Sequence, residues 1–345
     1  MALKRILIFC IFLIINTQVW GQESISQNEK NTHDVAIIFR FDNDLFIKAD
    51  DYYSNGLYLG FAKTSTSFEN NIYPKFLGRW LEHLPGLNSE DRMVNGGFSF
   101  AHRMFTPHDL KSFDVIETDM PYSGQFVGNF LASSQSTKHL DAWVLSLGVT
   151  GPVTRAEELQ FDVHYNLLAP TAKGWDTQLK NEFLANLFYE HRYRVFSLGQ
   201  KRRYFDLMLN AAGGLGNIES YAEAGLGIRL GVNIPDNFYS PASVFSEQTI
   251  GLLPSSHLKS NWSYYVFANL YGSYVAHTIV LDGNIFIDGP ALKYDPFWLR
   301  ANGGFVFAYR KFQVSFALSY LSLSWDNPKN KEGDLYGQLL FGFTF

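Results

Sequence analysis

Apolar and polar residues alternate with a period of two along most of the chain. In the clearest example Phe312, Val314, Phe316, Leu318 and Tyr320 are interleaved with Gln313, Ser315, Ala317 and Ser319. This period is typical of a β-strand, because successive side chains of a strand point to opposite faces. The pattern predicts about twelve strands, at 33–42, 55–64, 94–103, 122–133, 140–150, 182–196, 202–214, 219–232, 262–274, 297–310, 312–325 and 335–345.

A soluble β-sandwich would also alternate, and three features favour a membrane barrel instead. The predicted strands have about 9 to 11 residues or more, the length that crosses a bilayer. The face opposite the apolar one carries Arg40, Asp206 and Glu223, which suits a polar lumen. Aromatic residues such as Tyr264 and Tyr274 stand near strand ends, as in an interfacial girdle. The predicted fold class is therefore all-β, an antiparallel transmembrane β-barrel of the bacterial outer-membrane type.

The last segment sharpens this prediction. Residues 336–345 form an amphipathic strand with Phe341, Phe343 and Phe345 on one face. An uncapped aromatic edge would invite aggregation in a soluble protein, whereas closing the sheet removes the edge. The segment also resembles the assembly signal of outer-membrane barrels, which implies the barrel assembly machinery as a partner during biogenesis.

Composition excludes other classes. The chain has 345 residues, of which 46% are hydrophobic and 17% aromatic, and its mean hydropathy is −0.09. No internal stretch supplies the about 20 apolar residues of a transmembrane helix, so a polytopic helical membrane protein is excluded. A net charge of −5 argues against nucleic acid as a partner, because phosphate binding needs a basic surface.

The beginning of the chain predicts export. Lys4 and Arg5 precede an apolar run at 6–15, which is followed by Val19, Trp20 and the small residue Gly21. This order is typical of a secretory signal peptide, and the run is too short to span a bilayer. We therefore expect a signal peptide at residues 1–21, a single barrel domain at 22–345, and localisation in the bacterial outer membrane after export to the periplasm. The only cysteine, Cys10, lies in the apolar run, so the mature chain would have no thiol.

The topology places the connections on two sides of the membrane. With both termini in the periplasm, the connections after the first, third and fifth strands lie outside the cell, and the Arg310-Lys311 link is a periplasmic turn. The connections 65–93 and 233–261 are long for that side. Residues 76–84 could form a short amphipathic helix in the first of them.

Acidic and amide side chains gather where the first strand ends and the second begins. Asp42, Asn43 and Asp44 are followed by Asp50, Asp51 and Ser54. Hard oxygen ligands close together suit Ca²⁺, although Asp and Asn in loops are more often turn formers. The phase of the alternation points Asp42, Asp44 and Ser54 inward, whereas Asn43 needs a bulge or a strand end to join them.

A second candidate site lies in the long connection 151–181, which contains His164. An imidazole is a suitable general base near neutral pH. A single loop histidine among nine is more often a surface residue, so His164 is informative only together with other segments.

Taken together these segments resemble the lipid A 3'-O-deacylases, the LpxR family. The matching motifs are Asp42-Asn43-Asp44-Leu45-Phe46, Tyr53-Ser54-Asn55-Gly56-Leu57, Thr106-Pro107, Asp119-Met120-Pro121-Tyr122-Ser123-Gly124, and His164 with Gly174-Trp175-Asp176-Thr177-Gln178-Leu179-Lys180-Asn181-Glu182. The resemblance follows the mature chain in order, with its motifs concentrated in residues 35–185.

The resemblance implies a Ca²⁺-dependent, twelve-stranded outer-membrane esterase. Its substrate would be lipid A, the lipid anchor of lipopolysaccharide in the outer leaflet, from which it would hydrolyse the 3'-linked acyl chains. Other outer-membrane lipids would also be partners. It further implies that His164 is the base that activates water, and that Asn43 and Asp44 form the metal and oxyanion site with Ser54 in support. An amide donor and a cation beside the ester carbonyl would stabilise the developing charge.

The chain departs from the family pattern at several positions, among them Pro170, Met120, Ser123 and Ser54. Pro170 stands where some members have an acidic residue, so Asp162, Asp176 or Glu182 would have to orient the imidazole. Met120 replaces an arginine that could contact a phosphate. Two other functions stay open: a phospholipase-like outer-membrane hydrolase and a non-enzymatic barrel, either a passive pore or a structural protein. No Ser nucleophile with a partner His is evident for the former.

Overall fold

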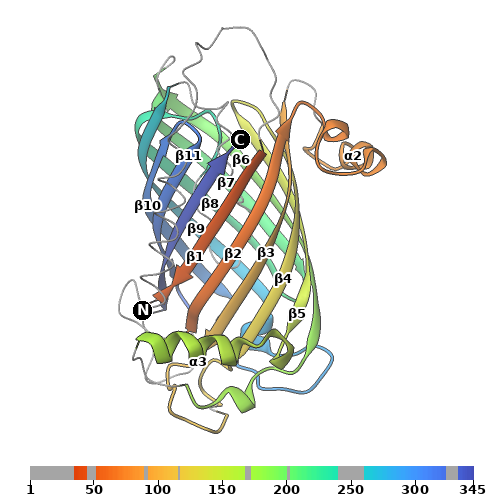
Figure 1. Ribbon diagram of the computed structural model, residues 1–345, viewed down its shortest axis with the longest axis vertical. Helices are drawn as coiled ribbons and strands as arrows, with labels where there is room; N and C mark the ends of the chain where they lie inside the picture. The colour runs from red at the N-terminus through yellow and green to blue at the C-terminus, as the bar shows by residue number, and fades with distance from the viewer. Residues whose placement is uncertain are drawn as a thin grey trace.

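The chain folds into a closed antiparallel barrel (Figure 1). The computed structural model describes residues 35–44, 52–88, 92–115, 117–167, 172–199, 203–239, 260–323 and 333–345, with the side chains of 163–167 left undescribed. These residues form twelve strands, each paired with its neighbours in the sequence, and the last strand pairs with the first. The strands are β1 Val35–Asn43, β2 Tyr52–Ser65, β3 Met93–Thr106, β4 Ser123–Gln135, β5 His139–Thr150, β6 Glu182–Leu198, β7 Arg203–Gly216, β8 Glu219–Ile234, β9 Trp262–Thr278, β10 Phe297–Tyr309, β11 Phe312–Leu321 and β12 Asp334–Thr344.

Short helices occupy the connections. They are α2 Lys75–Leu81, α3 Ala156–Leu167 and α4 Ile279–Asp282, with single 3-10 turns at η2 Phe68–Asn70, η3 Pro152–Thr154 and η4 Trp175–Thr177. Among the described residues, no helix is long and apolar enough to cross a membrane. The signal peptide expected at residues 1–21, with Cys10, lies outside the described residues, as do Asp50 and Asp51.

The predicted fold class is confirmed, and all twelve predicted strands are present. The largest differences are at strand ends. β2 begins at Tyr52, three residues before the predicted start, because a bulge continues the strand. β11 ends at Leu321, not at residue 325. The backbone N–H of Leu323 donates to the Leu321 carbonyl at 2.8 Å, a tight turn that takes the chain out of the ladder.

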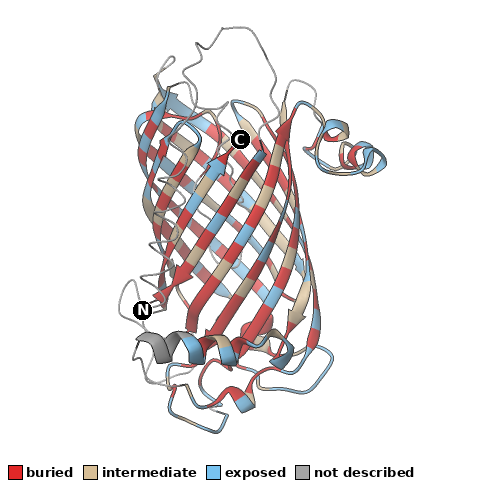
Figure 2. Ribbon diagram, in the orientation of Figure 1, coloured by how far each residue is buried: buried red, intermediate tan, exposed pale blue. Residues whose placement is uncertain are grey.

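The alternation in the sequence becomes two opposed surfaces of the barrel (Figure 2). Outward side chains such as Phe100, Phe130 and Leu145 are exposed, forming an apolar wall. Inward side chains such as Asn129 and Ser146 are buried and bond to each other, at 2.6 Å for this pair. The near-neutral mean hydropathy is thus the average of an apolar outside and a polar inside.

The barrel has two distinct ends, named here by their helices. At the α3 end, β1 ends and β2 begins. At the α2 end, β1 begins and β12 finishes, and the Phe345 N–H donates to the Val35 carbonyl at 2.8 Å. Arg310 and Lys311 form a two-residue turn between β10 and β11 at the α2 end, with Arg310 at a φ of 51°.

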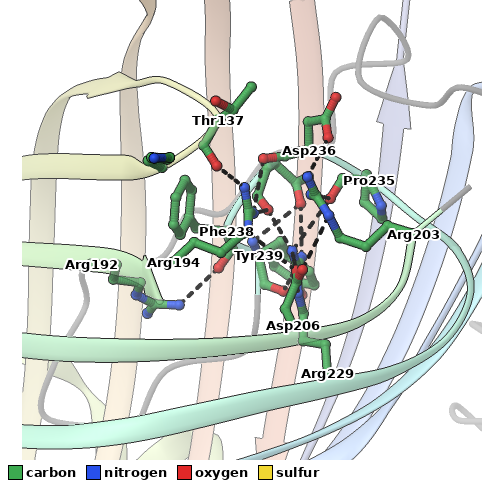
Figure 3. Close-up of polar contacts among 12 residues, drawn as sticks. Thr137, Arg192, Arg194, Arg203, Asp206, Arg229, Pro235, Asp236, Phe238 and Tyr239 are labelled. Carbon is green, nitrogen blue, oxygen red and sulfur yellow. Dashed lines mark hydrogen bonds and ion pairs between the residues drawn. The ribbon is translucent and has the colours of Figure 1, made fainter. Parts of the chain in front are cut away.

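One of the two long connections at the α2 end enters the lumen. Residues 235–239 follow β8, and Phe238 and Tyr239 are buried. Figure 3 shows four arginines gathered around this segment. Arg229 and Arg194 donate to the Asn237 carbonyl at 2.7 and 2.8 Å, and Arg192 donates to the Phe238 carbonyl at 2.8 Å.

Carboxylates complete this cluster. Asp206 lies 3.1 Å from Arg203 and pairs with Arg229. Asp236 forms an ion pair with Arg203 at 2.9 Å. Buried charges are stable only when they are paired and hydrogen-bonded. The arginines therefore hold the backbone of 235–239 inside the lumen.

We expect the barrel to be closed to ions, because lumen side chains are buried from the middle to the α2 end. Purified protein in planar bilayers should give no stepwise single-channel conductance, while a porin inserted in the same membranes does. Regular current steps of one size that scale with salt concentration would instead support a passive pore.

Candidate active site

The candidate site is built at the end of β1. Asn43 is the last residue of β1 and lies opposite Gly337 of β12 and Asn55 of β2. Asn43 and the following Asp44 are both buried. The register with both neighbouring strands stays regular through Asn43, so no bulge of β1 occurs here and Asn43 stands at the end of the strand.

A bulge shapes the opposite side of the site. The register between β2 and β3 shifts between Tyr53 and Asn55, which leaves Ser54 as the extra residue. Tyr52 takes a φ of 60° just before it, an uncommon conformation for a bulky residue. The regular alternation predicts that Ser54 points inward, but the bulge interrupts that alternation at this residue.

Two hydrogen bonds bring the site together. The Asn43 side-chain N–H₂ donates to the Ser54 backbone carbonyl at 2.8 Å. The Ser54 hydroxyl lies 2.5 Å from the hydroxyl of Thr106, the last residue of β3. Because the Asn43 nitrogen is directed to Ser54, its side-chain oxygen faces the other way. The site thus joins β1, β2 and β3. Thr106 lies in a matching motif, but no role is predicted for it from the sequence.

A buried charge pair underlies the site. Asp42 points into the lumen, where it lies 3.1 Å from Arg40 and accepts a hydrogen bond of 3.0 Å from the Tyr53 hydroxyl. A Cβ at Gly56 would lie 1.9 Å from that hydroxyl. The glycine of the motif therefore leaves room for Tyr53 to reach Asp42, and Asp42 serves the barrel interior.

His164 lies on α3, which covers this end of the barrel (Figure 1). The helix contacts β4. It begins so close to β4 that a Cβ at Gly124 would lie 2.5 Å from the Cβ of Ala156. His102 of β3 fixes the preceding turn through a 3.0 Å hydrogen bond to the Thr154 carbonyl. The glycine that ends the Asp119–Gly124 motif therefore allows the helix to dock.

The described part of α3 has one buried face. Ala156 and Gln160 are buried, whereas Glu157, Glu158 and Phe161 are exposed. Residues four apart lie on one face of a helix, so Ala156 and Gln160 define the side of α3 that packs on the barrel. The side chain of His164 lies outside the described residues, and its distance to Asn43, Asp44 and Ser54 remains a prediction.

The Gly174–Glu182 motif holds the helix from the other side. The indole N–H of Trp175 donates to the Gln160 side-chain oxygen at 2.7 Å. Its ring packs against Tyr122 at a centroid distance of 5.0 Å. Between α3 and this turn is a cavity of about 320 Å³, lined by Glu157, Glu158, Gln160, Phe161, Asp162, Ala172 and Trp175. That volume lies within the range of small-molecule sites.

We expect Trp175→Phe to loosen α3. The change leaves the buried Gln160 oxygen without its donor, at a cost of about 1–3 kcal/mol. Hydrogen exchange measured by mass spectrometry should be faster in the peptide covering 157–167. The matched control is Trp262→Phe, because Trp262 is exposed on the outer wall. Equal exchange in both variants would show that the indole does not hold the helix.

The acidic candidates for orienting His164 have different surroundings. Glu182 is buried and accepts the backbone N–H groups of Ile285 and Phe286 at 3.3 and 3.1 Å. Asp162 lies two residues from His164, a spacing that does not share a helix face. Asp176 is exposed and raises the pKa of Glu157, an effect second to that of partial burial. None of the three is assigned to His164.

Met120 is explained by packing. It is buried in an apolar cluster with Tyr52, Tyr53 and Phe105. The preceding Asp119 fixes the loop by accepting the backbone N–H of Met120 at 2.8 Å and that of Asp109 at 3.3 Å. Burial raises the pKa of Asp119, and these backbone donors oppose the shift. The methionine that replaces the family's arginine therefore packs against the tyrosines of the bulge.

The metal hypothesis has only two identified donors. Asp44 and Asn43 offer hard oxygens of the type that Ca²⁺ prefers, but Ca²⁺ takes about six to eight ligands. Among the described residues, no group of three or more His, Cys, Asp or Glu could hold a metal ion. The donor chemistry fits Ca²⁺ provided that backbone carbonyls and water complete the shell.

Comparisons with known proteins identify relatives. The family model described as "Outer membrane protein LpxR" matches residues 6–345. The structure of LpxR from Salmonella typhimurium superposes with a TM-score of 0.70 at 17% identity, covering 90% of this chain and 100% of that one. The β domain of the Bordetella autotransporter BrkA gives a TM-score of 0.39 at 8% identity, covering 90% and 98%. No curated protein matches the sequence.

Proposed function

Because the chain belongs to the LpxR family of outer-membrane proteins, we propose that it is a lipid A 3'-O-deacylase, a Ca²⁺-dependent carboxylic ester hydrolase. The barrel and the family indicate the outer membrane as its location. The proposal assigns the α3 end to the cell exterior, where the lipid A of lipopolysaccharide forms the outer leaflet. Export by a signal peptide and assembly by the barrel machinery belong to the same proposal.

One observation carries the proposal furthest. Asn43 and Ser54, eleven positions apart, are joined by a hydrogen bond at the strand ends. Asp44 is buried beside them, and Thr106 joins from β3. The helix α3, which contains position 164, is docked at the same end of the barrel. The family motifs thus converge on one region of an outer-membrane barrel.

In the proposed reaction His164 is the general base. It takes a proton from water as the water oxygen attacks the ester carbonyl carbon. The bond from that carbon to the sugar oxygen then breaks, and the proton passes to the sugar oxygen. The products are a free fatty acid and a lipid A with a 3'-hydroxyl. Water is the only co-reactant, and no covalent intermediate with the protein is needed.

Asn43 and Asp44 form the proposed oxyanion and metal site. Bound Ca²⁺ would supply positive charge beside the carbonyl oxygen. Asp44 would contribute its carboxylate and Asn43 its side-chain oxygen, which the bond to Ser54 directs away from β2. Ser54 supports the site through its carbonyl to Asn43 and its hydroxyl to Thr106. A preorganised site of this kind needs little rearrangement during the reaction.

A substrate comparison tests the proposal. Purified protein with Ca²⁺ is incubated with mixed micelles of lipid A and phosphatidylethanolamine, and released fatty acids and remaining lipids are identified by mass spectrometry. We expect 3-hydroxy or acyloxyacyl chains from the 3' position of lipid A and an intact phospholipid. Lysophospholipid with unchanged lipid A would favour the phospholipase-like alternative, and no release from either lipid would favour a non-enzymatic barrel.

A further inference from the structure

The connection between β2 and β3 covers part of the barrel's outer wall. We call residues 66–88, which include η2 and α2, the wall segment. Ser65 of β2, Val94 of β3 and Ala132 of β4 occupy outward positions, yet all three are buried. Phe68, Leu81 and Leu87 of the wall segment form one apolar cluster with Val94 and Ala132.

Polar contacts fix the wall segment to the strands. The Tyr73 hydroxyl lies 2.8 Å from the Gly97 carbonyl and 2.5 Å from the Leu131 carbonyl. The Trp143 indole N–H of β5 donates to the Pro85 carbonyl at 3.0 Å. The segment is therefore docked over β3 to β5 near the α2 end, and Figure 1 shows α2 standing out from the side of the barrel there.

The far side of α2 is apolar and uncovered. Leu77 and Leu81 face the barrel cluster. Phe76 is 76% exposed and Trp80 is 58% exposed, and the two lie on one face because they are four residues apart. The adjacent stripe carries Lys75 and Arg79, both exposed. A short helix with an aromatic face beside long basic side chains is typical of a membrane interface.

The uncovered face continues the lipid-facing wall. Phe98, Phe130 and Leu145 are exposed on β3, β4 and β5. The next outward positions toward the α2 end, at residues 96, 132 and 143, are the ones that the wall segment covers. The apolar outer wall of the barrel is therefore continuous with the wall segment. A lipid leaflet that contacts the outer wall here also contacts the wall segment.

We propose that the wall segment is a membrane-interface anchor for the phospholipid leaflet at the α2 end. Phe76 and Trp80 insert among the acyl chains, and Lys75 extends to the phosphate headgroups. Glu69 holds Arg79 at 2.9 Å, which ties η2 to α2. Because β2 to β4 carry the anchor at one end and Ser54 and Thr106 at the other, the anchor would set the height of the candidate site in the membrane.

Spin labelling tests the anchor. In a Cys10→Ser background, which removes the only cysteine, nitroxides are placed by Phe76→Cys and Trp80→Cys. Phe130→Cys is the lipid-facing control and Lys138→Cys, in the exposed β4–β5 turn, is the water control. The protein is reconstituted in phosphatidylethanolamine and phosphatidylglycerol vesicles, and collisions with oxygen and with a water-soluble nickel chelate are measured.

We expect the ratio of oxygen to nickel accessibility at 76 and 80 to match position 130 and to exceed position 138 several-fold. Nickel accessibility equal to that of position 138 would overturn the anchor. The same labels are read in isolated outer membranes. Water exposure in vesicles combined with protection from both reagents in native membranes would show that a protein partner, and not lipid, covers α2.

Discussion

His164→Ala is expected to lower the turnover of lipid A by a factor of about 100 to 10,000, the usual contribution of a general base. The protein should still fold, because the barrel ladders do not involve this position. Turnover is measured by mass spectrometry of lipid A treated with equal amounts of each protein. His83→Ala is the matched control, since His83 is exposed at the α2 end, away from the candidate site.

The pH dependence gives a second readout for the same residue. A general base works only when it is neutral, so activity should be lost as the pH falls and the imidazole takes up a proton. The residual activity of His164→Ala should lack this step. Equal rates in both proteins, or an unchanged pH profile, would remove His164 from the mechanism.

Asp44→Asn is expected to cause the second large loss, through Ca²⁺. The change keeps the shape of the side chain and removes its charge. Residues that only support a metal ligand typically affect affinity by about 10- to 100-fold, and a direct ligand should exceed that. The rate is measured against Ca²⁺ set by a chelator, and Ca²⁺ binding is followed separately by calorimetry.

Asp114→Asn is the control for this prediction, because Asp114 is an exposed acid in the β3–β4 connection at the same end of the barrel. We expect it to behave as the unmodified chain, while Asp44→Asn needs far more Ca²⁺ and recovers in part when Ca²⁺ is in excess. A chelator that leaves the unmodified rate unchanged would exclude the metal from the proposal.

The barrel was predictable because each strand repeats a signal that needs only local sequence. Phe312 to Leu321 reads as a strand from its alternation alone, and pairing with neighbours follows from the short link at Arg310 and Lys311. The connections were less accessible. The helical pattern around residues 76–84 predicted a helix, now observed at Lys75–Leu81, but not that it packs on the outside of β3 to β5.

The sequence nominates the candidate residues of the site but does not predict their geometry. Asn43 and Ser54 stand in recognisable motifs, yet their hydrogen bond depends on a bulge beside Tyr52. Tyr52 has a positive φ that its residue type does not predict, because such angles usually occur at glycine. Thr106 reaches Ser54 from 52 positions away, a contact that only the barrel register creates. Residues 235–239 do not alternate between apolar and polar side chains, so the local sequence does not predict that this segment enters the lumen among arginines (Figure 3).

The most direct test of the central claim is the structure of lipid A in living cells. The chain is expressed in a Gram-negative host that lacks a deacylase of its own, and lipid A from its outer membrane is examined by tandem mass spectrometry. We predict the loss of the ester-linked chain at the 3' position alone, with every other acyl chain retained. Lipid A identical to that of cells without the protein, although the barrel is folded in the outer membrane, would contradict the account.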